Sequence, residues 1–370
     1  MPNSILHICL SKGWGGLEMY PIRIGQRLKD RGYNVYGLCV KGTPVAKGMR
    51  EAGIETFEIE SKTTLVANQI FALNSWLKER SVTIIHSHKS GDILVSALLH
   101  MLIPRSSFFT EHMGSSSTKK DIYHKLLYRH LKRIFSISDA TYKRNLAALP
   151  ITEDRLSRLW LGTDISENLI SDENDISNIK KEVGLDISGP IIGNIGRMCD
   201  GKGQLELIDA FSIIKRSNTT SQLILVGGLK ENEGADIEYV EQLTQRVDQL
   251  GLQDSVHFLG FRTDTDRMLA IMDVVCLPNR NEAFGLTAIE AMAAKKAIVA
   301  ADTGALPEIL SNTALLAPPD QPDLIAIQIE RYANDEALRK ENAKKAYLRA
   351  HTEFSMDAHL DKLTQFYSTE

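Results

Sequence analysis

Two carboxylates eight positions apart, Glu282 and Glu290, form the most informative chemical pattern in the chain. Between them lies Gly285, which permits close approach of the backbone to a ligand. An apolar run at 274–277 precedes the pair, so we expect Glu282 in a loop and Glu290 one turn inside the following helix. A carboxylate there can accept paired hydrogen bonds from a ribose diol. The alternative is a charge on a helix surface.

Two basic residues, Arg197 and Lys202, follow another apolar run at 191–195. At the start of a helix they would repel each other and oppose the helix dipole, and an anionic ligand removes both penalties. An arginine fork and a lysine point charge suit a diphosphate. The alternative is a pair of solvated surface cations.

Two further loops combine glycine with polar groups. The stretch Lys12-Gly-Trp-Gly-Gly16 follows the first apolar run, and free N–H groups at a helix start favour a phosphate. It is not a G-x-G-x-x-G fingerprint, and a flexible turn is the alternative. His112 ends another apolar run beside Gly114, where loops tend to hold functional residues. Its alternative is a hydrogen-bonded residue at the edge of the core.

Length and composition bound the class of protein. A chain of 370 residues suggests two domains, at roughly 100–200 residues per domain. A net charge of −4 does not suggest a nucleic-acid binder. Four scattered cysteines without a C-x-x-C pattern suggest a reduced cytosol and no metal site or disulfide framework. No segment reaches the ~20 apolar residues of a membrane span. We therefore expect a cytoplasmic protein.

Short apolar runs alternate with amphipathic stretches in both halves of the chain, which predicts two doubly wound parallel sheets and an α/β fold class. A polar stretch from Leu161 to about Asp186 is the expected hinge. Two such domains would face each other across a cleft, with ligands bound where strands lead into helices. Strands are expected at 5–10, 35–40, 54–59, 82–86, 107–110, 134–137, 191–195, 223–226, 256–259, 274–277 and 298–300. Helices are expected at 17–31, 66–80, 92–101, 139–149, 204–215, 237–250 and 286–294.

Together these motifs resemble the retaining glycosyltransferases of the group 1 family, glycosyltransferase family 4, along nearly the whole chain. The resemblance implies the GT-B fold. It divides the chain into an acceptor-side Rossmann-like domain at 1–163, joined by a C-terminal helix at 353–368, and a donor-side Rossmann-like domain at 164–352. The matching motifs are Gly15-Gly16 with Glu18, Arg27-Leu-Lys-Asp-Arg-Gly-Tyr-Asn-Val35, Thr110-Glu-His112, Gly162-Thr-Asp164, Gly196-Arg-Met-Cys-Asp-Gly-Lys-Gly203, Val226-Gly-Gly228, Phe258-Leu-Gly260, Asp273-Val-Val, the Glu282/Glu290 pair and Gly304-Ala-Leu-Pro-Glu308.

The resemblance also implies a role for each matching residue. Arg197 and Lys202 would hold the donor diphosphate, and Glu282 would contact the hydroxyls of the donor sugar. His112 would lie beside the transferred sugar, which completes the implied catalytic set. The remaining donor-binding positions are Gly15 and Gly16 at the diphosphate, Arg262 near the base, main-chain groups of Ala283, Phe284, Gly285, Leu286 and Thr287, and Glu290 at the ribose.

The function implied is transfer of a sugar, with retention, from a nucleotide diphosphate sugar to a glycan or lipid-linked glycan in bacterial surface polysaccharide synthesis, of lipopolysaccharide or capsule. UDP-sugar is favoured over GDP-sugar as donor, with no cofactor and no metal. Asp264-Thr-Asp266 has the spelling of a metal motif but precedes a helix and is interpreted as an N-cap. The alternatives are a nucleotide-sugar 2-epimerase of GT-B fold, which needs no acceptor, and a non-catalytic nucleotide-sugar-binding protein.

The segment 119–134 is strongly basic and has apolar residues at helical spacing. A basic amphipathic helix can lie on an anionic membrane surface, whereas the alternative is an ordinary surface helix packed on the sheet. If this helix docks, the protein would lie peripherally on the inner face of the cytoplasmic membrane and act on a lipid-linked acceptor.

Overall fold

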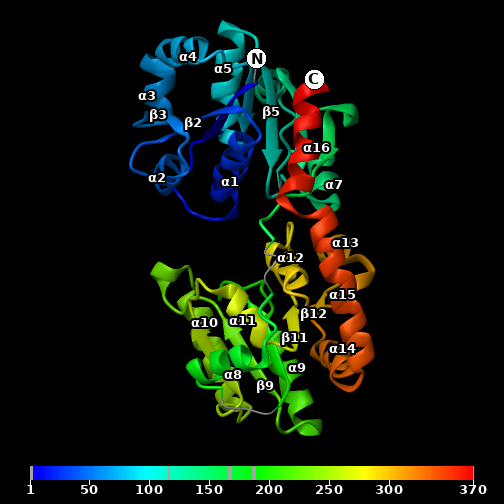
Figure 1. Ribbon diagram of the computed structural model, residues 1–370. Helices are drawn as coiled ribbons and strands as arrows, with labels where there is room; N and C mark the ends of the chain where they lie inside the picture. Colours follow the sequence, from blue (N-terminus) through cyan, green and yellow to red (C-terminus); the bar gives the residue numbers. More distant parts are fainter. Residues whose placement is uncertain (1–2, 116, 166–168, 186–188, 370) are drawn as a thin grey trace. The chain divides into compact units, whose positions relative to one another are not determined.

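The computed structural model describes residues 3–115, 117–165, 169–185 and 189–369 (Figure 1). The chain forms two compact units. Unit 1 comprises residues 1–162 and 356–370, and unit 2 comprises residues 163–355. Of the expected hinge, residues 166–168 and 186 lie outside the described part. Within that part, no helix combines the length and the apolar character that crossing a bilayer requires.

Unit 1 is built on a seven-stranded parallel sheet with the order β3-β2-β1-β4-β5-β6-β7. The order reverses between β1 and β4, and every residue of β1 is buried. The strands are β1 Ser4–Cys9, β2 Asn34–Val40, β3 Glu55–Ile59, β4 Ile84–Ser87, β5 Ser106–Glu111, β6 Leu131–Ser136 and β7 Leu156–Arg158. The helices are α1 Gly16–Asp30, α2 Pro44–Glu51, α3 Lys62–Thr64, α4 Ile70–Glu79, α5 Ile93–Leu102, α6 Ile122–Tyr128, α7 Asp139–Ala148 and α16 Met356–Thr369.

Unit 2 is built on a six-stranded parallel sheet with the order β10-β9-β8-β11-β12-β13, which reverses between β8 and β11. Its strands are β8 Ile191–Ile195, β9 Gln222–Val226, β10 Val256–Gly260, β11 Val274–Leu277, β12 Ala297–Ala301 and β13 Leu315–Ala317. Its helices are α8 Glu173–Glu182, α9 Gln204–Ser217, α10 Ile237–Gln249, α11 Thr265–Ile271, α12 Leu286–Ala293, α13 Leu306–Leu310, α14 Pro322–Asn334 and α15 Glu336–Glu353. The expected α/β class with two doubly wound parallel sheets is therefore confirmed.

The basic helix expected at 119–134 is wrong in its extent. Only α6 is helical there, because the chain turns into β6 at Leu131, three residues before the expected strand. Leu131 pairs with Ser107 and Ile134 with Phe109 of β5, and both apolar side chains are buried. Pairing with a neighbouring strand thus outweighs the helical spacing of the apolar residues. Of the helix expected at 66–80, the first four residues belong to a π-helical turn at Leu65–Gln69, and α4 forms the rest up to Glu79.

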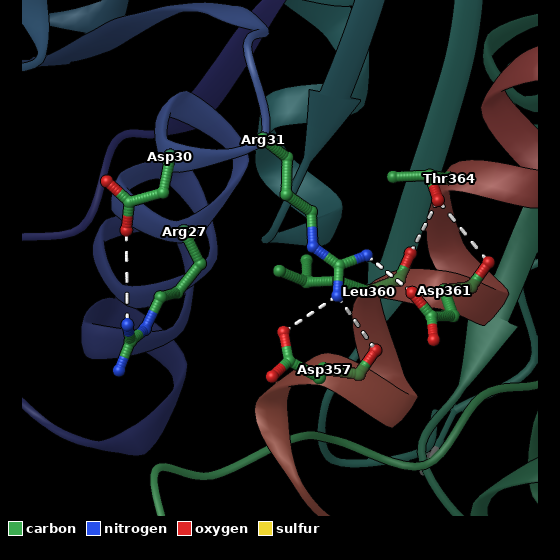
Figure 2. Close-up of polar contacts among 7 residues, drawn as sticks. All are labelled: Arg27, Asp30, Arg31, Asp357, Leu360, Asp361 and Thr364. Atoms are coloured by element: carbon green, nitrogen blue, oxygen red, sulfur yellow. Dashed lines mark hydrogen bonds and ion pairs between the residues drawn. The ribbon is translucent and has the colours of Figure 1, made fainter.

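The C-terminal helix α16 belongs to unit 1 and is fastened to α1 by charged groups (Figure 2). Arg31, directly after α1, donates to Asp357 at 2.8 Å and to Asp361 at 2.6 Å. Buried contacts add to these: the Tyr20 hydroxyl lies 2.8 Å from Nε2 of His359. The last helix of the chain is therefore part of the core of unit 1 and not a loose extension.

Candidate functional site

The predicted phosphate-binding loop and the predicted acidic loop meet at the switch point of unit 2. They follow β8 and β11, the neighbouring strands at which the sheet order reverses, so both leave the same edge. Gly203 has φ +76°, and a Cβ atom there would lie 2.2 Å from the carbonyl oxygen of Pro278. The Arg280 N–H donates to the Gly201 carbonyl at 3.0 Å. Only glycine at position 203 permits this close packing of the two loops.

Lys202 and Glu282 form an ion pair across these loops. The lysine Nζ lies 2.9 Å from Oε2 of Glu282, and the Asn279 amide donates to the same oxygen at 2.7 Å. Burial alone would raise the pKa of Glu282, but the charge of Lys202 and these hydrogen bonds outweigh it and hold the pKa below its usual value. The side chains remain 28% and 18% exposed, so the pair stays accessible to a ligand.

The motif at 304–308, one of the matching motifs, supports the backbone of Glu282. The Ala305 N–H donates to the Glu282 carbonyl at 2.9 Å. Gly304 has φ +66°, and a Cβ atom there would lie 2.7 Å from that carbonyl oxygen. The loop after β12 therefore fixes the position from which the carboxylate of Glu282 projects.

Helix α12 follows the acidic loop and begins after Gly285, whose φ is +98°. Leu286 and Thr287 form its first turn, where N–H groups lack partners within the helix and can bind an anion. Phe284 is buried and its ring packs against Phe354 at 6.2 Å between centroids, so only its main chain can contact a ligand. Glu290 is half-buried at the fifth position of α12, as the predicted helix requires.

A pocket of about 150 Å³ lies at the carboxyl ends of β8, β9 and β10. Its lining includes Arg197, Phe261, Arg262 and the glycine pair at 227–228. Arg197 is exposed, and its side chain has no ion-pair or hydrogen-bond partner within the described residues. It is therefore available to an anion at the edge of this pocket.

The guanidinium of Arg262 is held by the carboxylate of Asp264. Two parallel bonds of 2.8 and 2.6 Å join them. Asp264 does stand at the N-cap position of α11, but its side chain makes no capping hydrogen bond. The N-cap position expected for this aspartate is thus confirmed, while its carboxylate pairs with Arg262 and Arg267. Arg262 still lines the pocket.

In unit 1, the glycine loop after β1 is held by a short polar network. Gly15 is the N-cap of α1, and Gly16 is its first residue. The Ser11 hydroxyl donates to Glu18 at 2.6 Å and accepts from Lys89 Nζ at 3.2 Å. Lys89 lies just beyond β4, the strand beside β1 at the switch point of this sheet. The network fixes the loop that presents the two glycines.

His112 directly follows β5 and is only 4% exposed. Burial lowers the pKa of its imidazole to about 3, so the ring is neutral. Its ring lies edge-on to that of Tyr20, with 5.0 Å between centroids. Its Nε2 has no hydrogen-bond partner within the described chain. One ring nitrogen of a buried, neutral histidine thus lacks a hydrogen-bond partner among the described residues.

A cluster of buried histidines around His112 escaped the sequence analysis. His7 on β1 lies opposite His86 on β4, and its Nδ1 lies 3.0 Å from Nε2 of His88. Nitrogen atoms of these three histidines lie within 4.8 Å of one another, a spacing that could hold a metal ion. Both nitrogens of His86 are already hydrogen-bonded, to Tyr367 at 2.6 Å and Thr110 at 2.8 Å. A metal would have to displace one of these contacts. The spelling His86-Ser-His88 after an apolar run was the available signal.

Comparison with known proteins identifies two adjoining families. Residues 14–167 match the family described as Glycosyltransferase Family 4, and residues 175–349 match Glycosyl transferases group 1. The chain is 36% identical over 141 residues to mannosylfructose-phosphate synthase of Agrobacterium fabrum, covering 37% of this chain and 31% of that protein. It is 26% identical over 227 residues to the lipopolysaccharide core biosynthesis mannosyltransferase LpsB of Rhizobium meliloti, covering 61% of each. The matches thus span less than two thirds of these relatives.

Solved structures show the same fold over the full chain. A glycosyltransferase from Rickettsia africae superposes with a TM-score of 0.89 at 21% identity, covering 99% of this chain and 98% of that one. The Anabaena protein HepE in complex with UDP-glucose superposes with a TM-score of 0.81 at 22% identity, covering 99% and 100%. With two family matches that cover successive parts of the chain and this common architecture, the protein belongs to the group 1 glycosyltransferases of family 4 and has the GT-B fold.

Proposed function

We propose that the protein transfers a sugar, with retention, from a nucleotide diphosphate sugar to a glycan or lipid-linked glycan of a bacterial surface polysaccharide. The proposal rests above all on the Lys202–Glu282 pair at the switch point of unit 2. The names of two similar proteins agree with it: one is a lipopolysaccharide core mannosyltransferase, and the other is bound to UDP-glucose. We therefore favour UDP over GDP in the donor.

In the proposed donor complex, the diphosphate binds Arg197, Lys202 and the first N–H groups of α12. Arg197 has no competing side-chain partner within the described residues, and an ammonium offers three donors, so Lys202 can keep Glu282 while it binds phosphate. Glu282 stays ionised beside Lys202 and accepts hydrogen bonds from sugar hydroxyls. The ribose binds Glu290, and the base enters the pocket beside Arg262.

Catalysis would then consist of positioning and stabilisation of the leaving group. Negative charge develops on the diphosphate as the glycosidic bond breaks, and two cations and a helix N-terminus stabilise it. The departing phosphate accepts the proton of the incoming hydroxyl on the same face, which retains the configuration. Glu282 is engaged by Lys202 and Asn279, which argues against its use as a nucleophile in a double displacement. In unit 1, the proposal assigns Gly15 and Gly16 to the diphosphate and the neutral His112 to the transferred sugar.

The acceptor side includes a proposed membrane contact around α6. Ile122, Tyr123 and Leu126 are 77%, 56% and 63% exposed, and four basic residues flank them at 119, 120, 125 and 129. Exposed apolar groups bordered by cations suit an anionic membrane surface. This patch, shorter than the expected helix, supports a peripheral position on the cytoplasmic face. Sedimentation with vesicles that is independent of their anionic lipid content would remove this part of the proposal.

A donor screen with a paired lysine variant tests the function. Purified protein is incubated with a panel of nucleotide sugars, with and without a detergent extract of bacterial glycolipids, and free nucleoside diphosphate is measured. We expect release with one donor to rise with the extract. Lys202→Ala should lower kcat/KM by roughly 10²–10³-fold, the effect of removing one donor to a developing anion.

Lys340→Ala is the matched control, because Lys340 forms an exposed pair with Glu336 at 2.7 Å on α15. This variant should retain normal turnover. Normal turnover of Lys202→Ala would contradict the assignment of the site. Conversion of the donor to its 2-epimer, with no glycosylated product, would instead favour the 2-epimerase, and nucleotide binding without any turnover would favour a binding protein.

A further inference from the structure

A groove on unit 1 has no part in the site described above. It lies between α1 and α2, with a volume of about 310 Å³, within the range of ligand sites. Its lining includes Trp14, Ile22, Arg23, Gln26, Gly48 and Glu51. Trp14 stands directly before Gly15 and Gly16, so the groove adjoins the loop at the carboxyl end of β1.

Trp14 is held in place although much of it faces solvent. The residue as a whole is 52% exposed, which is unusual for tryptophan, the largest apolar residue. Gly48 makes room for it: a Cβ atom there would lie 3.3 Å from Cη2 of Trp14 and 2.7 Å from Cδ1 of Ile22. The indole therefore rests against α2 while part of its surface remains open. The C–H groups on one face of a pyranose ring pack well on such an electron-rich surface.

Polar groups able to bind sugar hydroxyls lie beside the indole. Arg23 and Gln26 are three residues apart on α1, on the same face of the helix. Arg23 is half-buried, and no side-chain hydrogen bond or ion pair engages it among the described residues. By contrast, Arg27 on the same helix has Asp30 at 3.9 Å, and Glu51 in the groove has Lys47 at 3.8 Å. Arg23 is thus a half-buried cation whose N–H groups can bind a ligand.

We propose that this groove binds one sugar ring of the acceptor glycan, stacked on Trp14 and hydrogen-bonded by Arg23 and Gln26. The inference rests on the proposed function, because only a transferase needs an acceptor. A pyranose ring has an apolar face of C–H groups and a rim of hydroxyl groups. The indole of Trp14 can pack against the face, while the guanidinium of Arg23 and the amide of Gln26 can bind the hydroxyls. The adjoining glycine loop then leads from this ring towards the reacting hydroxyl.

Initial rates at increasing glycolipid extract and fixed, saturating donor test the proposal. Trp14→Ala should raise the KM for the extract up to about tenfold, the scale of one lost aromatic packing contact. Trp14→Phe, which keeps an aromatic ring, should retain most of the affinity, and Arg23→Gln should also weaken it. Nucleotide binding in the absence of extract should stay unchanged in all three variants.

Two controls remove comparable side chains outside the groove. Phe71→Ala deletes an aromatic residue that is 69% exposed on α4, and Arg27→Gln removes a neighbouring arginine of α1. Both should behave as wild type. If the wild-type rate rises with extract and Trp14→Ala shows the same KM, the groove proposal is overturned while the proposed function stands. If no donor gives an extract-dependent rate in the wild type, the proposed function itself fails, and the groove proposal with it.

Discussion

Lowering the pH from 7 to 5 should destabilise unit 1, because its core contains neutral histidines. Burial lowers the pKa of His7 and of His112 to about 3, and that of His359 to about 4. Each histidine titrates near 6.5 in the unfolded chain, so below that pH the unfolded state binds more protons than the folded state. The stability that these groups contribute is therefore present above pH 6.5 and is lost as the pH falls towards the folded pKa.

The magnitude follows from the shifts. Between pH 7 and 5, each of these three histidines costs about 2 kcal/mol, together about 6 kcal/mol. Burial lowers the pKa of His86 and His88 as well, which adds to the loss. Asp92 opposes it: burial raises its pKa to about 7, so its uptake of a proton on folding restores about 2 kcal/mol over the same range.

A net loss of about 4 kcal/mol or more is thus expected, a large part of the 5–15 kcal/mol that stabilises a typical domain. Tryptophan fluorescence can follow it, because all three tryptophans, Trp14, Trp76 and Trp160, lie in unit 1. Urea unfolding at pH 7, 6 and 5 gives the free energy at each pH. In the variant His7→Asn, which lacks the imidazole, the slope between pH 7 and 5 should fall by about 1 kcal/mol per pH unit, the share of one histidine.

A free energy of unfolding that stays level or rises between pH 7 and 5 would refute this reasoning. So would an unchanged slope in His7→Asn, because it would mean that the pKa of His7 is the same in the folded and the unfolded protein. A lower overall stability of the variant does not affect the test, since only the dependence on pH reports the buried imidazole.

Two further predictions concern single contacts. Arg31→Gln removes the ion pairs between α1 and α16, and because their carboxylates are largely exposed we expect a loss of about 1 kcal/mol, smaller at high salt, in the same urea assay. An equal loss at high and low salt would contradict an electrostatic origin. Gly203→Ala should lower the melting temperature of unit 2, measured by circular dichroism, because the new Cβ atom would overlap the Pro278 carbonyl. Gly201→Ala is the control: Gly201 has φ +82° but nothing within 4 Å of a Cβ atom, so this variant should lose only about 1 kcal/mol of stability. Equal melting temperatures of the two variants would show that the loops do not pack so closely.

The sequence alone determined the α/β class and most of the strands, although β7, β13 and the helices α2, α14 and α15 were not predicted. Buried parallel strands have an apolar run of a few residues, and helices have one apolar face, so both are visible in a local window. Most predicted strands lie within two residues of those observed, such as Ile191–Ile195 and Val274–Leu277. The loops with glycine and charge at strand ends were also found, because the turn chemistry of such loops is local.

Tertiary structure alone decided which of these groups meet. Lys202 and Glu282 are 80 residues apart, and the sequence assigned them to different parts of a ligand; they pair because β8 and β11 are neighbours in the sheet. His7 and His86 come together because β1 and β4 pair in register. The register of β6 against β5 likewise overrode a helical pattern at Leu131. Such contacts depend on strand order, and strand order is set by the packing of the whole sheet rather than by any short stretch of sequence.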